Sequence, residues 1–316
     1  MFKLFDALIQ PVACYACQVW LPNSGLYKLF DQTSDCENKH PSKRISMDPL
    51  ENLHLSFLKW TMNVNKSTSN SAVWGDCGRY PLGVSLTKLV FNFKERLDQL
   101  DTDNSPRLVR HAYKEQKTLQ LTWYKSLDTV KQALESEEKR TLTRPSQIRE
   151  AMRRWFLKIW NIDRHSNKKL IFYNTIKHEF RAEKYLNLDL DACSSKRIGQ
   201  LRTSSHRYNI ETGRHGTNRA KLLNRVCMHC STQDVETLDL LLELPFPDPI
   251  IEDEDHVLRT CPLYKDLRNK LQPKTKTYLS SDVGQIFSDS TTIRDIGRFL
   301  TKAYDRRFPR TTQKPK

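Results

Sequence analysis

Apolar residues recur at helical spacing along most of this chain, and no stretch of a strand's length alternates cleanly between apolar and polar residues. The clearest case follows Pro81, where apolar residues stand three or four positions apart: Leu82, Leu86, Leu89, Phe93, Leu97 and Leu100. This spacing places their side chains on one face of an α-helix. Only 9 of the 316 residues are glycine, which disfavours sandwiches and nucleotide-binding α/β folds. We therefore expect an all-α protein with little sheet.

The order of polar, basic and apolar stretches predicts four regions. Residues 1–140 are expected to be helical, with a polar loop over 21–48, and residues 141–226 to form a basic helical region. A small metal-binding module over 227–272 precedes a C-terminal helix and basic tail over 273–316, whose last dozen residues we expect to be disordered.

The first twenty residues are apolar enough to raise the question of membrane insertion. Polar residues and a proline interrupt them, namely Asp6, Gln10, Pro11 and Gln18, and no signal-peptide cleavage site follows. We therefore expect a buried helix and no membrane partner.

Cys14 and Cys17 form a C-x2-C pair in this segment without further ligands nearby, which favours core packing. Eight cysteines spread over the chain are not a disulfide scaffold, and they indicate the nucleus or cytoplasm.

Four potential metal ligands follow one another in the order Cys-x2-Cys, spacer, His-x4-Cys: Cys227, Cys230, His256 and Cys261. Two thiolates at this spacing can hold one zinc ion, and a distant His and Cys complete a tetrahedron. His229 is a weaker alternative ligand. We expect Asp253 to cap the turn that carries His256, Pro262 to start a helix, and Glu254 or Asp255 to orient the His256 ring. Three ordinary free cysteines and a surface histidine remain the alternative.

Positive charge predicts a polyanionic partner. Lys and Arg number 52 against 37 Asp and Glu, a net charge of +15. Residues 194–225 hold eight basic residues and one acidic residue, interleaved with aromatic side chains. The predicted nucleic-acid contacts in this segment are Arg202, His206, Arg207, Arg214, Arg219 and Arg225. A second basic helix offers Arg149, Arg153, Arg154 and Lys158, although its aromatic residues fit a core face equally well. A merely solvating basic surface is the alternative.

No catalytic motif stands out. The sequence contains no glycine-rich phosphate loop and no evident Ser/His/Asp set, so we expect no small-molecule substrate. The contiguous acidic string 252–255 is not a metal-catalysis cluster, because neighbouring carboxylates in a run splay apart.

Several stretches resemble the reverse transcriptases of LINE-type (non-LTR) retrotransposons. "LFDALIQPVACYACQVW" is similar to the start of the family's thumb region, where a "PV..YG.E.W" element occurs. "LHLSFLKWTMNVNKSTSNSAVWGDCGRYPL" resembles the stretch after it, which typically ends in a "GELGRYPL"-like motif. "RTSSHRYNIETGRHG", followed by "RVCMHC" and "EDEDHVLRTCPLY", resembles the C-terminal end of the same polyproteins, where an "SSH.L.IE.GR" segment leads into a CCHC zinc knuckle.

The resemblance spans nearly the whole chain and implies a helical thumb-like region, a basic region and a zinc knuckle. Ala16 and Gln18 stand where the family usually has Gly and Glu, and Asp76 and Cys77 replace its Glu-Leu. The family's polymerase palm carries an Asp-Asp motif, whereas this chain contains no Asp-Asp pair, and the endonuclease is missing too. Two-metal nucleotidyl transfer needs paired carboxylates, so we expect no enzymatic activity.

The expected function is zinc-dependent binding of RNA or DNA, with other retroelement proteins as further partners. Three alternatives remain open. The chain could serve an active polymerase supplied in trans or by a longer product, it could be a helical protein-interaction scaffold, or it could be a translated retroelement remnant without a selected function.

Overall fold

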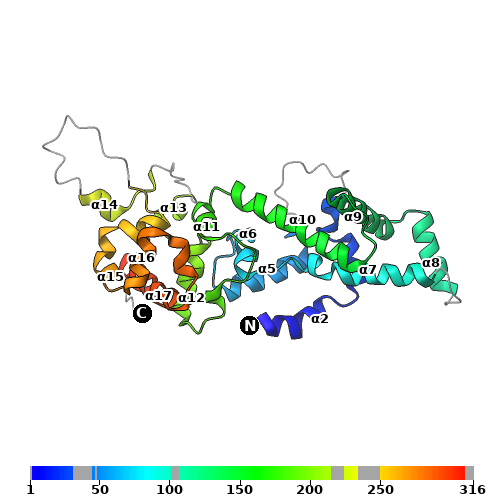
Figure 1. Ribbon diagram of the computed structural model, residues 1–316, viewed down its shortest axis with the longest axis horizontal. Coiled ribbons are helices and arrows are strands. Elements are labelled where there is room, and N and C mark those ends of the chain that lie inside the picture. Colours follow the sequence, from blue (N-terminus) through cyan, green and yellow to red (C-terminus); the bar gives the residue numbers. More distant parts are fainter. Residues whose placement is uncertain are drawn as a thin grey trace, which may run out of the picture. The chain divides into compact units, whose positions relative to one another are not determined.

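The computed structural model describes residues 2–30, 45, 46, 48–100, 107–214, 224–233 and 250–309. Helices dominate these residues, and the strand pairing among them consists of two isolated bridges, so the predicted all-α fold is confirmed. The chain forms two compact units, each built from two sequence segments (Figure 1). The first unit contains residues 1–61 and 78–166, and the second contains residues 62–77 and 167–316.

The long helices of the first unit are α5 (Pro49–Thr61), α7 (Leu82–Leu100), α8 (Arg107–Thr118), α9 (Thr122–Glu138) and α10 (Pro145–Ser166). Helix α10 packs along α7, as Figure 1 shows. The predicted apolar face of α7 is confirmed at Leu82 and Leu86, which are buried, whereas Leu89 is half exposed. On α10, Met152 and Phe156 are fully buried.

Local signals in the sequence set several helix ends. The Asp48 carboxylate accepts a hydrogen bond from the backbone N–H of Leu50 at 3.0 Å, which satisfies a free donor at the start of α5. Helix α6 (Asn70–Cys77) ends at Gly78, whose φ of 60° lies in the left-handed region that glycine adopts without strain.

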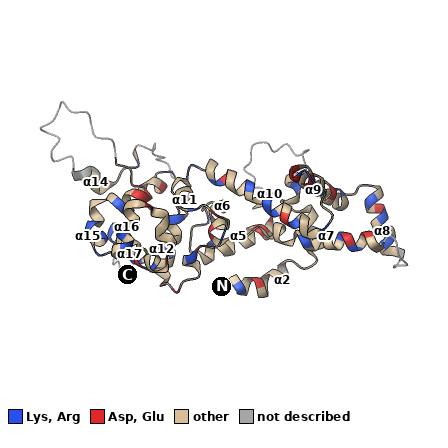
Figure 2. Ribbon diagram, in the orientation of Figure 1, with Lys and Arg blue, Asp and Glu red and all other residues tan. Residues whose placement is uncertain are grey.

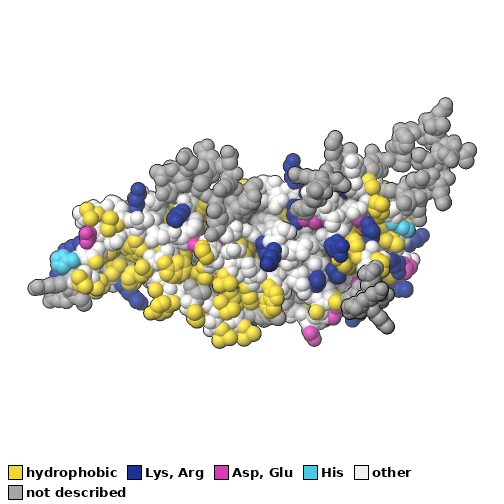
Figure 3. Space-filling view, turned by 180° about the vertical axis from the view of Figure 1, so that it is seen from behind, with side chains coloured by type: hydrophobic (Ala, Val, Ile, Leu, Met, Phe, Trp, Pro, Cys, Tyr) yellow, Lys and Arg dark blue, Asp and Glu magenta, His cyan; other side chains and the backbone are white. Residues whose placement is uncertain are grey.

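The N-terminal segment differs from the predicted buried helix. It is broken into short turns, α1 (Phe2–Leu4), η1 (Phe5–Ile9), α2 (Gln10–Ala13) and α3 (Cys17–Trp20). Phe5 is buried, and core packing is confirmed for Cys17, whereas Cys14 is only half-buried. Val12 and Tyr15 are 77% and 82% exposed. Apolar side chains gather along the lower edge of the face in Figure 3. No single described helix is long and apolar enough to cross a membrane, although the bent pair Phe2–Val12 and Cys17–Asn23 meets the length and composition requirement together.

The predicted polar loop over 21–48 is wrong for its first third. Residues 21–30 form the 3-10 turns η2 (Leu21–Asn23) and η3 (Tyr27–Phe30), and both turns bury apolar side chains: Leu21, Tyr27 and Phe30. Residues 31–44 and 47 lie outside the described residues.

The second unit surrounds a separate apolar core. Besides α6 it contains α11 (Ile171–Ile176), η4 (Lys184–Leu186), α12 (Ala192–Arg202), α13 (Asn209–Thr212), α14 (Met228–Gln233), η7 (His256–Thr260), η8 (Pro262–Tyr264), α15 (Lys265–Asn269), α16 (Pro273–Ser281), η9 (Val283–Phe287) and α17 (Ser290–Arg307). Helix α12 packs against α17, where a Cβ atom at Gly297 would lie 2.9 Å from that of Ser194. Only glycine permits this approach.

The unit boundaries differ from the predicted ones at residues 140 and 226. Helix α10 belongs to the first unit because it packs on α7. Helix α6 belongs to the second, because Asp76 at its end binds Arg202 of α12 at 2.9 Å. The sequence placed α6 in the first region because that pairing joins residues far apart in the chain.

Candidate metal centre

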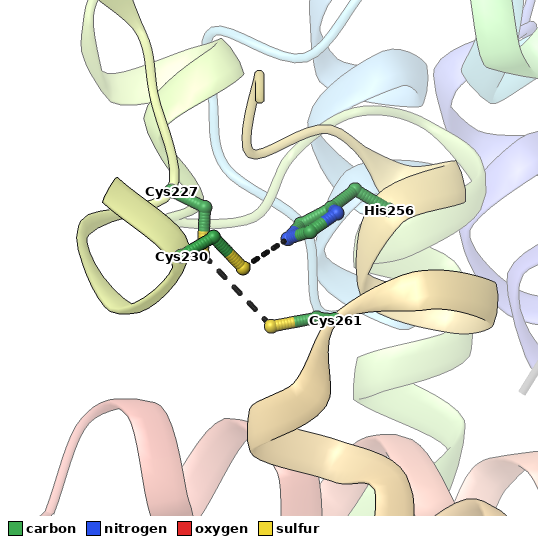
Figure 4. A group of neighbouring side chains, drawn as sticks. All are labelled: Cys227, Cys230, His256 and Cys261. Atoms are coloured by element: carbon green, nitrogen blue, oxygen red, sulfur yellow. Dashed lines mark hydrogen bonds between the residues drawn. The ribbon is translucent and has the colours of Figure 1, made fainter. Parts of the chain in front are cut away.

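The four predicted metal ligands come together in the second unit. Their ligand atoms all lie within 4.8 Å of one another, and all four side chains are buried. The sulfur atoms of Cys227 and Cys261 are 3.9 Å apart, and Cys230 Sγ lies 3.4 Å from His256 Nε2. Figure 4 shows the two pairs facing one another from separate parts of the chain.

A short antiparallel pairing joins the two halves of the site. Val226 and Ile251 form an isolated bridge, within which the N–H of Cys227 donates to the Ile250 carbonyl at 2.8 Å. Helix α14 begins directly after Cys227, so Cys230 lies one turn further along. The pairing therefore brings residues on either side of the spacer close together, while residues 234–249 of the spacer lie outside the described residues.

One wide helical turn carries the other two ligands. In η7 the N–H of Cys261 donates to the His256 carbonyl at 2.8 Å. The Asp253 carboxylate accepts the His256 N–H at 2.8 Å, as predicted. Pro262 begins η8 directly after Cys261, and α15 follows, which confirms the predicted helix start.

Thr260 orients the His256 ring. Its hydroxyl lies 2.9 Å from Nδ1, which leaves Nε2 directed at the thiols. The prediction that Glu254 or Asp255 would fill this role is wrong. Glu254 binds His206 and Ser204, and Asp255 pairs with Arg259 at 3.0 Å. The signal for Thr260 was present in the sequence, because a residue four positions after His256 lies over it on a helical turn.

Two of the six distances between the ligand atoms match a tetrahedral zinc ion, and all six lie within 4.8 Å. Zn–S bonds of about 2.3 Å and a Zn–N bond of about 2.0 Å give S···S and S···N edges of about 3.8 and 3.5 Å. The observed distances of 3.9 and 3.4 Å lie close to both values. A hydrogen bond with Cys261 lowers the pKa of Cys227, and the same bond raises the pKa of Cys261. This buried Cys3His cluster could thus hold a metal ion, and its sulfur-rich donors favour zinc over hard cations.

Three of the predicted nucleic-acid contacts are buried: Arg202, His206 and Arg225. Arg202 is 0% exposed, and its guanidinium donates two hydrogen bonds to Asp76, both 2.9 Å long. His206 is also buried, and its Nε2 lies 2.9 Å from Glu254. These side chains hold the unit together and do not face solvent.

The other predicted contacts differ in accessibility. Arg225 is buried, with its guanidinium donating to the Ile210 carbonyl at 3.2 Å, so it is also unsuited to contact phosphate. Arg214 is half-buried and pairs with Glu211. Arg207 is exposed, and Arg219 lies outside the described residues.

The second predicted basic surface is largely ion-paired. In the first unit, Arg154 pairs with Glu138 at 2.7 Å and Lys158 with Glu137 at 2.6 Å. Arg149 and Arg153 both approach Glu150 at 3.1 Å. Acidic neighbours thus offset much of the charge of this helix. Sequence reasoning alone missed these pairs because α9 supplies two of the three carboxylates.

Comparison with protein-family models, with curated proteins and with solved structures finds no match to this chain.

Proposed function

We propose that this chain binds one zinc ion through Cys227, Cys230, His256 and Cys261, and that the ion supports binding of RNA or DNA by the second unit. The observation that carries the proposal is a set of buried hydrogen bonds between the segment that holds His256 and the segment that holds Arg207. A zinc ion with four protein ligands has no open coordination position, so its contribution would be structural.

Two glutamates form this connection. Glu254, two residues before His256, accepts hydrogen bonds from Ser204 at 2.6 Å and from His206 at 2.9 Å. Burial alone would raise the pKa of Glu254. The nearby His206 and the hydrogen bonds from His206 and Ser204 outweigh burial, so the pKa of Glu254 lies below its usual value. Glu252 accepts the backbone N–H of Asn209 at 2.9 Å. The residues on both sides of Arg207 are thus anchored to the metal-binding segment.

Positive charge supplies the attraction. The net charge is +15, and Lys and Arg lie on helices of both units (Figure 2). Phosphate neutralisation by such residues releases counterions, so the affinity would fall as salt rises. The resemblance to the thumb and C-terminal zinc portion of LINE-type reverse transcriptases supports the same function, and we propose that origin. The proposal involves no catalytic step, and it places the protein in the nucleus or cytoplasm.

The test is a titration of labelled single-stranded RNA and DNA with zinc-loaded protein and with a Cys261→Ser variant. Loss of one ligand is expected to weaken or abolish zinc binding and to reduce the affinity for both strands. Cys193→Ser is the matched control, because Cys193 is an exposed free thiol at the start of α12. Unchanged nucleic-acid affinity in a zinc-free Cys261→Ser protein would overturn the proposal.

A further inference from the structure

A pocket of about 600 Å³ lies in the second unit where the end of α17 meets α12 and the segment after it. Three guanidiniums and two aromatic rings line it: Arg197, Arg207, Arg307, Tyr304 and Phe308. Asp305 is the one acidic side chain in its described lining.

Two of the guanidiniums have no acidic partner within the described residues. Arg307 donates to Glu252 at 2.7 Å, so its charge is already offset. Arg197 donates to the neutral amide oxygen of Gln200 at 2.8 Å, while its Nε is buried and bonded to no described group. Arg207 is exposed and forms no ion pair to any residue that the structure describes. Arg197 and Arg207 therefore remain available to an anion.

The aromatic rings lie directly beside these cations. The Arg197 guanidinium is 3.3 Å from the centre of the Tyr304 ring, and that of Arg207 is 5.2 Å from the centre of Phe308. The two rings are 4.7 Å apart with a 49° tilt, and each is half-buried. Sites for single-stranded nucleic acid combine cations that contact the backbone with aromatic rings on which bases stack, and this pocket offers both.

We propose that this pocket is a specific contact site for single-stranded nucleic acid. Arg197 and Arg207 would bind one backbone phosphate, and an adjacent unpaired base would stack against the Tyr304–Phe308 pair. The inference rests on the proposed function and names the residues that perform it. His206 and Tyr208, on both sides of Arg207, are buried and line a small adjacent cavity that shares Arg197 and Tyr304 with the pocket.

The first test replaces one cation and compares it with a matched control. Arg207→Ala and Arg294→Ala each remove one exposed arginine from the second unit, and Arg294 lies about 15 Å along α17 from Tyr304. The probe is a fluorescent single-stranded RNA of about twelve nucleotides, within the range that such sites cover. Arg207→Ala is expected to weaken binding about tenfold and to reduce the salt-dependence slope by about 0.7. Arg294→Ala should change the affinity less than about twofold.

A second variant tests the aromatic contact. Phe308→Leu keeps an apolar side chain but removes the ring, and it is expected to weaken single-stranded binding about fivefold. Binding to a duplex of the same sequence should change little, because its bases are already stacked. Equal losses of affinity in Arg207→Ala and Arg294→Ala would indicate that RNA binds through diffuse surface charge. Either this result or an unchanged affinity in Arg207→Ala would overturn the proposal that the pocket is a specific contact site. If the unaltered protein binds neither RNA nor DNA, the proposed function itself fails.

Discussion

The buried charges around Arg202 lead to a quantitative prediction. The positive charges of Arg202 and Lys177 are balanced by the negative charges of Asp76 and Glu183, and all four side chains are largely buried. Arg202 donates to Asp76 and also lies 3.1 Å from Glu183, while Lys177 lies 2.5 Å from Glu183. Burial lowers the pKa of Lys177 despite these acidic neighbours. The group is neutral as a whole, so removing one member leaves an uncompensated buried charge.

Arg202→Met removes one cation and leaves Asp76 without its two strongest hydrogen bonds. Breaking a buried ion pair in this way costs about 3 to 5 kcal/mol of unfolding free energy. For a unit of about 150 to 250 residues, this loss corresponds to a fall of about 10 °C in the melting temperature. Zinc-saturated protein would be measured by urea unfolding and by scanning calorimetry.

A double variant separates lost charge balance from lost packing. In Asp76→Leu/Arg202→Met, Lys177 and Glu183 still neutralise one another, and the remaining cost comes mainly from the Tyr185 hydroxyl, which donates to Asp76 at 3.2 Å. The double variant should therefore recover at least about 2 kcal/mol relative to Arg202→Met. The reasoning is refuted if the double variant is no more stable than Arg202→Met, or if Arg202→Met costs less than about 1 kcal/mol.

Two further predictions concern smaller groups. Thr260→Val removes the hydroxyl at His256 Nδ1 and should lower zinc affinity about 10- to 100-fold in a chelator competition. Thr277→Val, at an exposed position of α16, should leave the zinc affinity unchanged. Equal affinities in the two variants would contradict the assigned role of Thr260. The hydrogen bond from Arg306 lowers the pKa of Asp266 to about 2. Because this pKa lies below the unfolded value of about 3.9, the stabilising contribution is present above about pH 4 and is lost as pH falls towards 2. Arg306→Ala should return the pKa towards its unfolded value in a carboxyl NMR titration, and an unchanged pKa would show that Arg306 is not its cause.

Features set by local sequence could be predicted. The C-x2-C and H-x4-C spacings each put two ligands on one turn, so the order of residues already implied the cluster that the structure assembles. Asp48 and Gly78 lie at helix ends, where capping and left-handed backbone depend on neighbouring residues alone. The apolar face of α7 followed from its period.

Features set by distant partners could not be predicted. Arg202 looked like one more cation in a basic segment, yet its partner Asp76 lies 126 positions earlier in the chain. The pocket was also missed, because the segment containing Arg307 and Phe308 was expected to be disordered, whereas α17 extends to Arg307. The spacing of Tyr304 and Phe308, four residues apart, was the available signal that the helix continues to this point.

Zinc-edge X-ray absorption on protein purified without added metal tests the central claim most directly. The account predicts one zinc ion per chain with three sulfur neighbours at about 2.3 Å and one nitrogen neighbour at about 2.0 Å. A coordination shell of oxygen and nitrogen alone, or protein that retains no zinc, would contradict the assignment of Cys227, Cys230, His256 and Cys261 as a metal centre.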